Sequence, residues 1–170
     1  MLLNKNQKIV VAVALTVLLL SVFRLIPVKS EESVELTLSR LPDEVWTVIN
    51  NIEDYPQFWA KAPKALQNKK MPFEFFLLDS EGKPSDRKYL VKKYERPTLL
   101  VLLIPPNFGS PFGDTQWTFI LSENEGKTTL RIEEDGSLAG WFITGIFTSI
   151  GFNTNLKDYA QSLKNFMEPN

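Results

Sequence analysis

An unbroken apolar run near the start of the chain dominates its hydropathy pattern. Residues 9–23 read IVVAVALTVLLLSVF, with no charge and only Thr16 and Ser21 polar. A helix over residues 9–26 would be about 27 Å long, close to the hydrocarbon thickness of a bilayer. Arg24 lies near the end of this stretch, where its long side chain can reach the headgroups. The pattern therefore predicts one transmembrane helix that acts as an N-terminal anchor.

Two other structures for this segment stay open. A cleaved signal peptide would need small residues after the apolar run, whereas residues 24–30 read RLIPVKS, which is a poor cleavage site. A buried core helix would show a polar face, which this segment lacks. Basic residues flank the segment almost equally, and the amino terminus adds one charge before it. The positive-inside rule therefore favours an extracytoplasmic domain by a small margin, and the orientation stays open.

The polar residues 27–32 predict a short juxtamembrane linker. The chain then divides into an anchor with its linker, residues 1–30, and one folded domain, residues 31–170. From Val34 to Ser39 apolar and polar residues alternate, which is typical of a strand with one wet face.

A helix is expected directly after this strand. Pro42 suits the first turn, and the two acidic residues after it favour the positive end of the helix dipole. Tyr55-Pro56 predicts a break, because the residue before proline disfavours helical geometry. A second short helical or irregular segment is expected around Phe58 and Trp59.

Residues 64–135 show the alternation and turn signals of a sheet. Strands are expected near residues 64–69, 73–79, 87–95, 98–104, 114–122 and 127–135. The sequences SEGK at 80–83 and NEGK at 124–127 predict hairpin turns. The connection at 105–113, PPNFGSPFG, predicts a stiff loop with apolar tips, either a lid or a segment that dips into the membrane.

The last part of the chain predicts one long helix. Residues 138–152 carry no charge, and from Asn155 onward the pattern is amphipathic. A strand, two helices, a run of strands and a final helix form an order typical of an α+β fold. In that class helices cover one side of an antiparallel sheet.

Composition narrows the chemistry. The 170 residues include no histidine and no cysteine. This excludes Ser-His-Asp and Cys-His catalysis, disulfides, and metal sites built on those residues. Four of the 19 basic residues and none of the 20 acidic ones lie in the first 30, so residues 31–170 carry 15 basic and 20 acidic residues. This net charge of −5 disfavours nucleic acid as a partner.

Two motifs carry a resemblance to a known family. Residues 41–46 read LPDEVW, and residues 52–59 read IEDYPQFW. With residues 113–121, residues 128–134 and an aromatic-rich C-terminal helix, they resemble the START-like, helix-grip superfamily. The resemblance spans about residues 33–167 and is closest to the SRPBCC branch of polyketide cyclases/dehydrases and lipid-transport proteins.

The resemblance implies a curved antiparallel sheet of about six to seven strands wrapped around a long C-terminal helix. A hydrophobic cavity would lie between the sheet and the helix. Members of the superfamily bind lipids, sterols, polyketides, quinones or plant hormones, and some are cyclases or hydrolases. The transmembrane anchor would be an addition to that plan.

Eight aromatic residues fall on segments that a helix-grip fold turns inward. Core packing explains each of them singly. As a set they predict an apolar interior with few polar anchors, the usual makeup of a ligand pocket. These cavity candidates are Trp59, Phe75, Tyr89, Trp117, Phe119, Trp141, Phe142 and Phe147.

Other candidate chemistry has a simpler structural explanation. Asp54-Tyr55 is a tempting acid–base pair, but aspartate before a turn usually caps it. The acidic run at 133–135 lacks the spacing of a cation site, because neighbouring strand residues point to opposite faces. The basic cluster at 87–96 fits lipid headgroups or an acidic ligand, but also the solvated face of a strand.

Our leading hypothesis is a membrane-anchored protein that binds a hydrophobic small molecule, of lipid, quinone or polyketide class, without catalysis, cofactor or metal. Its partners would be that ligand and the bilayer, through residues 9–26. Two alternatives stay open. One is a cyclase- or hydratase-type enzyme that uses Tyr, Asp or Arg in the cavity. The other is a ligand-free interaction module at the membrane.

Overall fold

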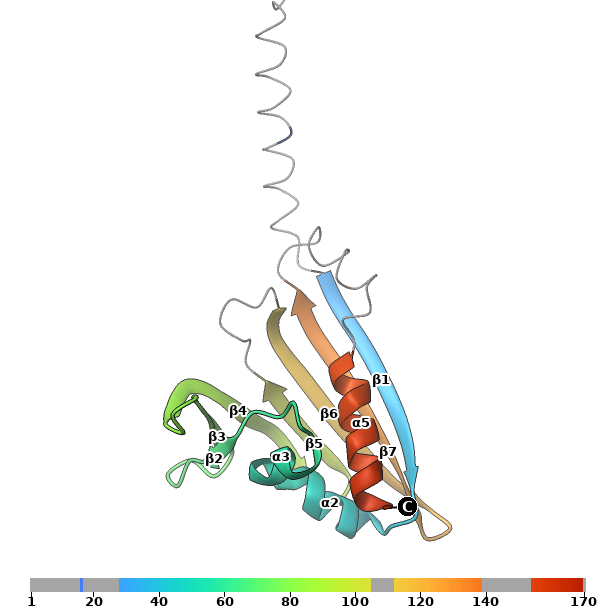
Figure 1. The fold of residues 1–170 in the computed structure, drawn as a ribbon. Helices are drawn as coiled ribbons and strands as arrows, with labels where there is room; N and C mark the ends of the chain where they lie inside the picture. The colour runs from blue at the N-terminus through green and yellow to red at the C-terminus, as the bar shows by residue number, and fades with distance from the viewer. Residues whose placement is uncertain (1–15, 17–27, 105–111, 139–153, 170) are drawn as a thin grey trace, which may run out of the picture.

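The computed structural model describes Thr16 and residues 28–104, 112–138 and 154–169. Most of the described chain forms one curved antiparallel sheet, and the C-terminal helix lies across one face of it (Figure 1). The strands are β1 (Val28–Leu38), β2 (Ala65–Gln67), β3 (Glu74–Leu78), β4 (Pro84–Glu95), β5 (Leu99–Ile104), β6 (Phe112–Asn124) and β7 (Lys127–Leu138). The helices are α2 (Pro42–Asn50), the 3₁₀ helix η1 (Ile52–Asp54), α3 (Tyr55–Phe58) and α5 (Thr154–Met167). The predicted α+β helix-grip arrangement is thereby confirmed.

The seven strands follow the order β1-β7-β6-β5-β4-β3-β2, and each neighbouring pair is antiparallel. From β2 onward, consecutive strands are neighbours, and β1 closes the far edge beside β7. The predicted turn between β6 and β7 is confirmed. Glu125 and Gly126 both have positive φ there, 52° and 73°, as a two-residue hairpin turn requires.

The long strands β1 and β7 extend further than the sequence predicted. Val28–Glu32 belong to β1, so the linker expected at 27–32 is wrong for these residues. They pair with residues 134–138 of β7, which in turn shows that the final helix does not start at residue 138. The backbone hydrogen bonds of the β1–β7 ladder form irrespective of side-chain polarity, so a polar run can still be a strand.

Three short helices connect β1 to β2. Pro42 begins α2, and the Glu44 carboxylate accepts a hydrogen bond from the Leu41 backbone N–H at 2.9 Å. Helix α2 ends at Asn50, and the predicted second short helical segment is α3, although Tyr55 itself starts this helix and Pro56 lies in its first turn. Proline is tolerated at this position, since the first helical N–H groups have no intrahelical acceptor.

Helix α5 confirms the amphipathic pattern at the C-terminus. Its inward side chains recur at helical spacing and are all buried, namely Leu156, Tyr159, Ala160, Leu163 and Met167. They face the apolar side of the sheet, where Leu100, Phe119 and Ile132 are 0% exposed. The core therefore lies between the concave face of the sheet and one stripe of this helix (Figure 1).

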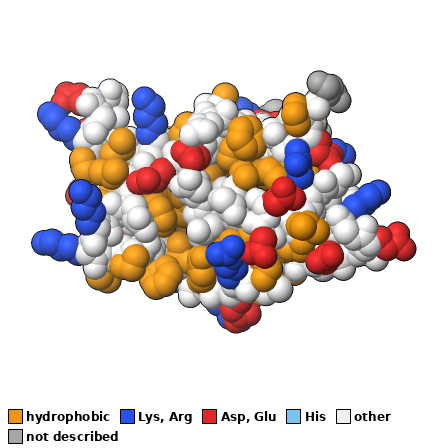
Figure 2. Space-filling view, turned by 90° about the horizontal axis from the view of Figure 1, so that it is seen from below, with side chains coloured by type: hydrophobic (Ala, Val, Ile, Leu, Met, Phe, Trp, Pro, Cys, Tyr) orange, Lys and Arg blue, Asp and Glu red, His pale blue; other side chains and the backbone are white. Residues whose placement is uncertain are grey.

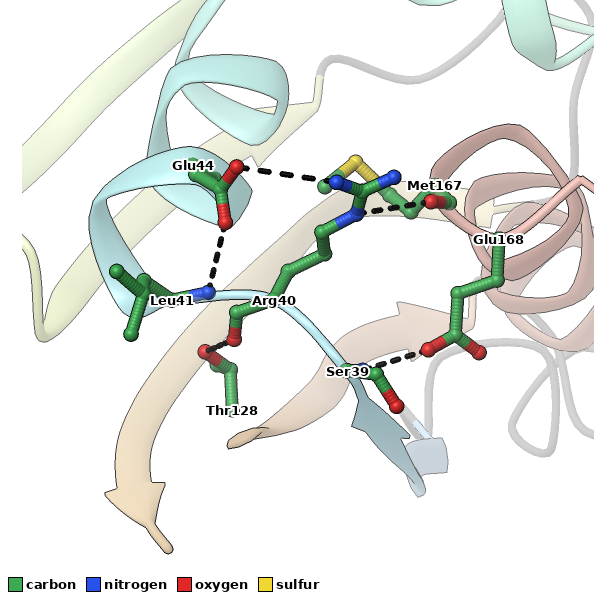
Figure 3. A network of polar contacts seen from close by, with 7 residues as sticks. All are labelled: Ser39, Arg40, Leu41, Glu44, Thr128, Met167 and Glu168. Carbon is green, nitrogen blue, oxygen red and sulfur yellow. Dashed lines mark hydrogen bonds and ion pairs between the residues drawn. The ribbon is translucent and has the colours of Figure 1, made fainter. Parts of the chain in front are cut away.

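A polar network fixes the C-terminal end of α5 to the chain between β1 and α2 (Figure 3). The Ser39 backbone N–H donates to the Glu168 carboxylate at 2.5 Å, and Arg40 Nε donates to the Met167 carbonyl at 3.2 Å. The buried Thr128 hydroxyl donates to the Arg40 carbonyl at 2.6 Å. These bonds join β7, the β1–α2 connection and α5, so they fix where the helix crosses the sheet.

Replacing Thr128 with valine tests this junction. Thr128→Val leaves the Arg40 carbonyl without its buried donor, and we expect the free energy of unfolding to fall by about 1–2 kcal/mol. Urea denaturation of residues 28–170 measures it. Thr37→Val, at an exposed position on β1, is the matched control and should change stability by less than about 0.5 kcal/mol. Equal effects of the two substitutions would contradict this role for Thr128.

Candidate functional site

Strand β6 turns two aromatic side chains toward α5. Trp117 and Phe119 occupy alternate positions of β6 and are 3% and 0% exposed. Trp117 lies between Leu102 of β5 and Glu134 of β7 in the ladder. Alternation along a strand places side chains two apart on the same face, so both rings line the concave side of the sheet.

Tyr159 of α5 is the centre of the aromatic side chains in the interior. It is fully buried, and its ring lies 5.1–5.8 Å from five other aromatic rings, measured between centroids. These contacts are edge-on, the geometry that aromatic quadrupoles prefer. We call these six residues the Tyr159 cluster: Tyr55, Phe58, Trp59, Trp117, Phe119 and Tyr159.

The cluster brings together three of the eight predicted cavity residues, Trp59, Trp117 and Phe119. Phe75 and Tyr89 are also buried, and they pair across β3 and β4. Trp141, Phe142 and Phe147 lie outside the described residues. Whether these eight line a ligand site stays a prediction.

Sequence reasoning missed the residue at the centre. Tyr159 lies in the amphipathic segment that begins at Asn155, a pattern that by itself indicates only core packing. Its signal was present, because a tyrosine in the middle of a buried stripe brings a hydroxyl that needs a partner. Tyr55, named above only beside Asp54 and Pro56, is buried inside the cluster.

Polar groups within the cluster differ in whether they have a hydrogen-bond partner. The Tyr55 hydroxyl donates to the Ile49 carbonyl at 2.6 Å. The Trp59 Nε1–H and the Tyr159 hydroxyl are buried and reach no acceptor in hydrogen-bond geometry among the described residues. The Tyr55 and Tyr159 hydroxyls lie close enough for each to shift the pKa of the other, lowering that of Tyr55 and raising that of Tyr159. Their arrangement falls outside hydrogen-bond geometry. A buried donor without an acceptor is costly, and native proteins rarely leave one so.

The tyrosines of the interior stay neutral at physiological pH. Burial raises the pKa of Tyr159 well above its usual value, and the neighbouring Tyr55 and Tyr89 raise it further. Burial likewise raises the pKa of Tyr55 and of Tyr89. These hydroxyls can donate and accept hydrogen bonds but are not poised to act as bases near neutral pH.

One carboxylate reaches the edge of the cluster. Glu134 accepts a hydrogen bond from Trp117 Nε1 at 2.6 Å and pairs across strands with Glu32 of β1. Burial raises the pKa of Glu134, and the nearby Glu32 carboxylate raises it as well, whereas the bond from Trp117 opposes the shift. Burial and a like charge therefore outweigh one hydrogen bond.

The other candidate chemistry does not converge on the interior. The Asp54 carboxylate accepts hydrogen bonds from Asn51 and Gln57, while the Tyr55 hydroxyl points to Ile49. Glu133 pairs with Arg131 on the opposite face from Glu134. No group of residues suited to hold a metal ion occurs in the described part of the chain.

Charges of the predicted basic cluster are mostly used in ion pairs at the surface. Lys88 pairs with Glu74 at 2.8 Å, Lys93 with Glu95 at 2.9 Å, and Arg96 with Asp43 at 2.9 Å. The solvated-strand interpretation therefore accounts for these positions. Such exposed pairs contribute little stability.

Large hydrophobic side chains also remain at the surface. Those exposed are Leu41, Leu66, Met71, Phe73, Tyr94, Ile120 and Phe166. Figure 2 views the end of the molecule at which α2 lies, and hydrophobic side chains there are interspersed with charges of both signs.

Within the described residues, no helix is long and apolar enough to cross a membrane. The predicted anchor at 9–26 and most of the 105–113 loop fall outside those residues.

Comparisons with known proteins agree on the fold. No protein-family model matches the chain, and no curated protein matches it. Among solved structures, a START superfamily protein from Mycobacterium smegmatis aligns with a TM-score of 0.61 and 14% identity, covering 81% of this chain and 96% of that one. A truncated norcoclaurine synthase from Thalictrum flavum aligns with a TM-score of 0.62 and 11% identity, covering 85% and 96%.

A two-domain aromatase/cyclase, StfQ from the steffimycin biosynthetic pathway, is similar over half of its length. The TM-score is 0.59 and the identity 8%, with 82% of this chain and 50% of that one covered. At such identities the likeness shows the fold alone. The expected START-like, SRPBCC-like fold is thereby confirmed.

The raised pKa of Glu134 predicts a pH dependence of stability. The folded protein binds the Glu134 proton more tightly than the unfolded chain does. Proton binding therefore stabilises the fold fully at pH values below the usual pKa of glutamate. This stabilisation is lost as the pH rises through the raised pKa. Glu134→Gln keeps an oxygen for Trp117 Nε1 and removes the charge. We expect this variant to be at least as stable as the wild type at neutral pH.

Urea denaturation of the two proteins across the acid and neutral range measures this difference. The advantage of Glu134→Gln should shrink as the pH falls below the usual glutamate range, where the wild-type side chain is also neutral. A variant that is less stable at neutral pH, and whose deficit shrinks on acidification, would show that the charged form is favoured instead.

Proposed function

We propose that the protein binds one hydrophobic small molecule between the concave face of the sheet and α5, and holds it without catalysing a reaction. The observation that carries this proposal is the pair of buried donors in the Tyr159 cluster, Trp59 Nε1 and the Tyr159 hydroxyl, which have no acceptor among the described residues. An aromatic wall with a few unpaired polar groups is the usual composition of a ligand site.

The fold supports the same proposal. The chain shares its fold with a START superfamily protein and with an aromatase/cyclase. In this fold α5 lies across the sheet (Figure 1), and the Tyr159 cluster joins this helix to β6. Affinity would come from burying apolar surface of the ligand, at about 25 cal/mol per Å². Candidate ligand classes are lipids, quinones and polyketides.

A binder accounts for the interior better than an enzyme does. The described polar groups of the cluster are neutral donors, and the one nearby carboxylate is already bonded to Trp117. With no histidine or cysteine in the chain, the common proton-transfer and nucleophilic side chains are missing.

We further propose that residues 9–26 anchor this domain in a bilayer, with the domain on the extracytoplasmic side. The support is the uncharged run at 9–23 and the start of β1 at Val28, which leaves almost no linker. A domain held this close to the membrane would exchange an apolar ligand with lipid without carrying it through water.

Ligand binding is tested on residues 28–170. Organic extraction of the purified domain should release roughly one apolar molecule per chain, identified by mass spectrometry. After its removal, Nile red should bind and accept excitation energy from the interior tryptophans. Trp117→Leu should weaken this binding, whereas Phe73→Ser, at a side chain 54% exposed, should leave it unchanged.

Two results would contradict the binding proposal. One is a folded domain that carries no small molecule and takes up no dye. The other is dye binding that is lost in Phe73→Ser and retained in Trp117→Leu, which would place the apolar site at the surface and favour an interaction module.

The anchor is tested by fractionation. The full chain should stay with membranes through a carbonate wash, because an apolar helix of this length is held by the hydrocarbon core. Deletion of residues 1–26 should give a soluble, folded domain. A full chain released by carbonate, or a shortened chain that is insoluble, would be evidence against the proposed boundary.

A further inference from the structure

The three described tryptophans in or near the core differ in what their indole N–H groups donate to. Trp117 Nε1 donates to Glu134 at 2.6 Å. Trp59 Nε1 and Trp46 Nε1 are buried and reach no acceptor among the described residues. Trp46 contacts Tyr94, whose side chain is 42% exposed, and does not belong to the Tyr159 cluster.

Trp59 is placed differently. Its ring lies 5.6 Å from that of Trp117 and 5.4 Å from that of Tyr159, so it is held between the sheet and α5. The Tyr159 hydroxyl is the second unpartnered donor in the same cluster. Two neutral donors therefore lie within one apolar interior, and acceptor oxygens are the groups that complement them.

Building on the ligand site proposed above, we propose that the ligand carries a neutral acceptor oxygen, a carbonyl, that receives a hydrogen bond from Trp59 Nε1. The Tyr159 hydroxyl is the second donor. The rest of the ligand is apolar and packs on the aromatic rings of the cluster. The chemical class is therefore a ketone, ester or quinone rather than a plain hydrocarbon or a free fatty acid.

The charges around the cluster favour a neutral ligand. The Glu134 carboxylate lies beside Trp117, and Glu32 lies next to it on β1, so an anionic headgroup would meet like charge. Burial keeps the tyrosine hydroxyls protonated, which preserves them as donors. Arg87 of β4 lies close enough to Tyr89 to lower its pKa. Such a cation would attract an anionic ligand, so a fatty acid is the probe that tests for a preference for anions.

Three probes of equal chain length separate these cases: methyl nonyl ketone, undecane and undecanoic acid. The full chain in nanodiscs binds each probe, and empty nanodiscs of the same lipid give the blank. We expect the ketone to bind about tenfold more tightly than undecane, since one buried hydrogen bond is worth about that factor. The carbonyl of ¹³C-labelled ketone should show an infrared band at lower frequency when bound, as for a hydrogen-bonded carbonyl.

Trp59→Phe should lower the affinity for the ketone about tenfold and leave that for undecane within about twofold. It should also return the carbonyl band toward its frequency in hydrocarbon. Retained binding of undecane shows that the variant is folded. Tyr159→Phe should reduce the preference for the ketone in the same direction.

A matched control removes the same group outside the proposed site. Trp46→Phe deletes a buried indole N–H that has no acceptor among the described residues and lies outside the cluster. It should leave the ratio of ketone to undecane affinities unchanged.

The outcomes separate the two proposals. Binding of no probe would reject the ligand site itself. Equal binding of ketone and undecane, tightest binding of undecanoic acid, or an unchanged ratio in Trp59→Phe would overturn the carbonyl assignment and leave an apolar site. A ketone preference that disappears in Trp59→Phe and survives in Trp46→Phe would support it.

Discussion

The packing of Tyr159 against the concave face of the sheet is the contact on which the interior depends. The side chain comes from α5, yet its ring meets residues of α3, β6 and the turn after α3 at once. The far end of this helix is also tied to the β1–α2 connection through Arg40, Ser39 and Glu168. A network at one end of the helix thereby positions an aromatic group two turns away.

The interior buries many apolar side chains, but some of its buried N–H and O–H groups have no hydrogen-bond acceptor among the described residues. Tyr55 and Trp117 have found acceptors in Ile49 and Glu134, while Trp59 and Tyr159 have not among the described residues. A purely structural core gains nothing from this arrangement, since each unpaired donor lowers stability. In the function proposed above, the same donors remain available to a ligand and give selectivity.

Local patterns in the sequence predicted most of the fold and only part of the site. Alternation and the NEGK turn located β6 and β7, because period and turn chemistry are properties of adjacent residues. The extension of β1 through Lys29 to Glu32 was missed, since those residues owe their strand structure to a partner about 100 positions away. Tyr159 was missed for the same reason, as its five ring contacts are all distant along the chain.

The central claim is that Trp59 Nε1 donates a hydrogen bond to a bound ligand. A crystal structure of the chain, purified with its native contents, tests this most directly. The account predicts electron density of a small molecule between the sheet and α5, with an oxygen about 3 Å from Trp59 Nε1. An indole N–H bonded to a carbonyl of the protein itself, with side chains filling the space around it, would contradict the account.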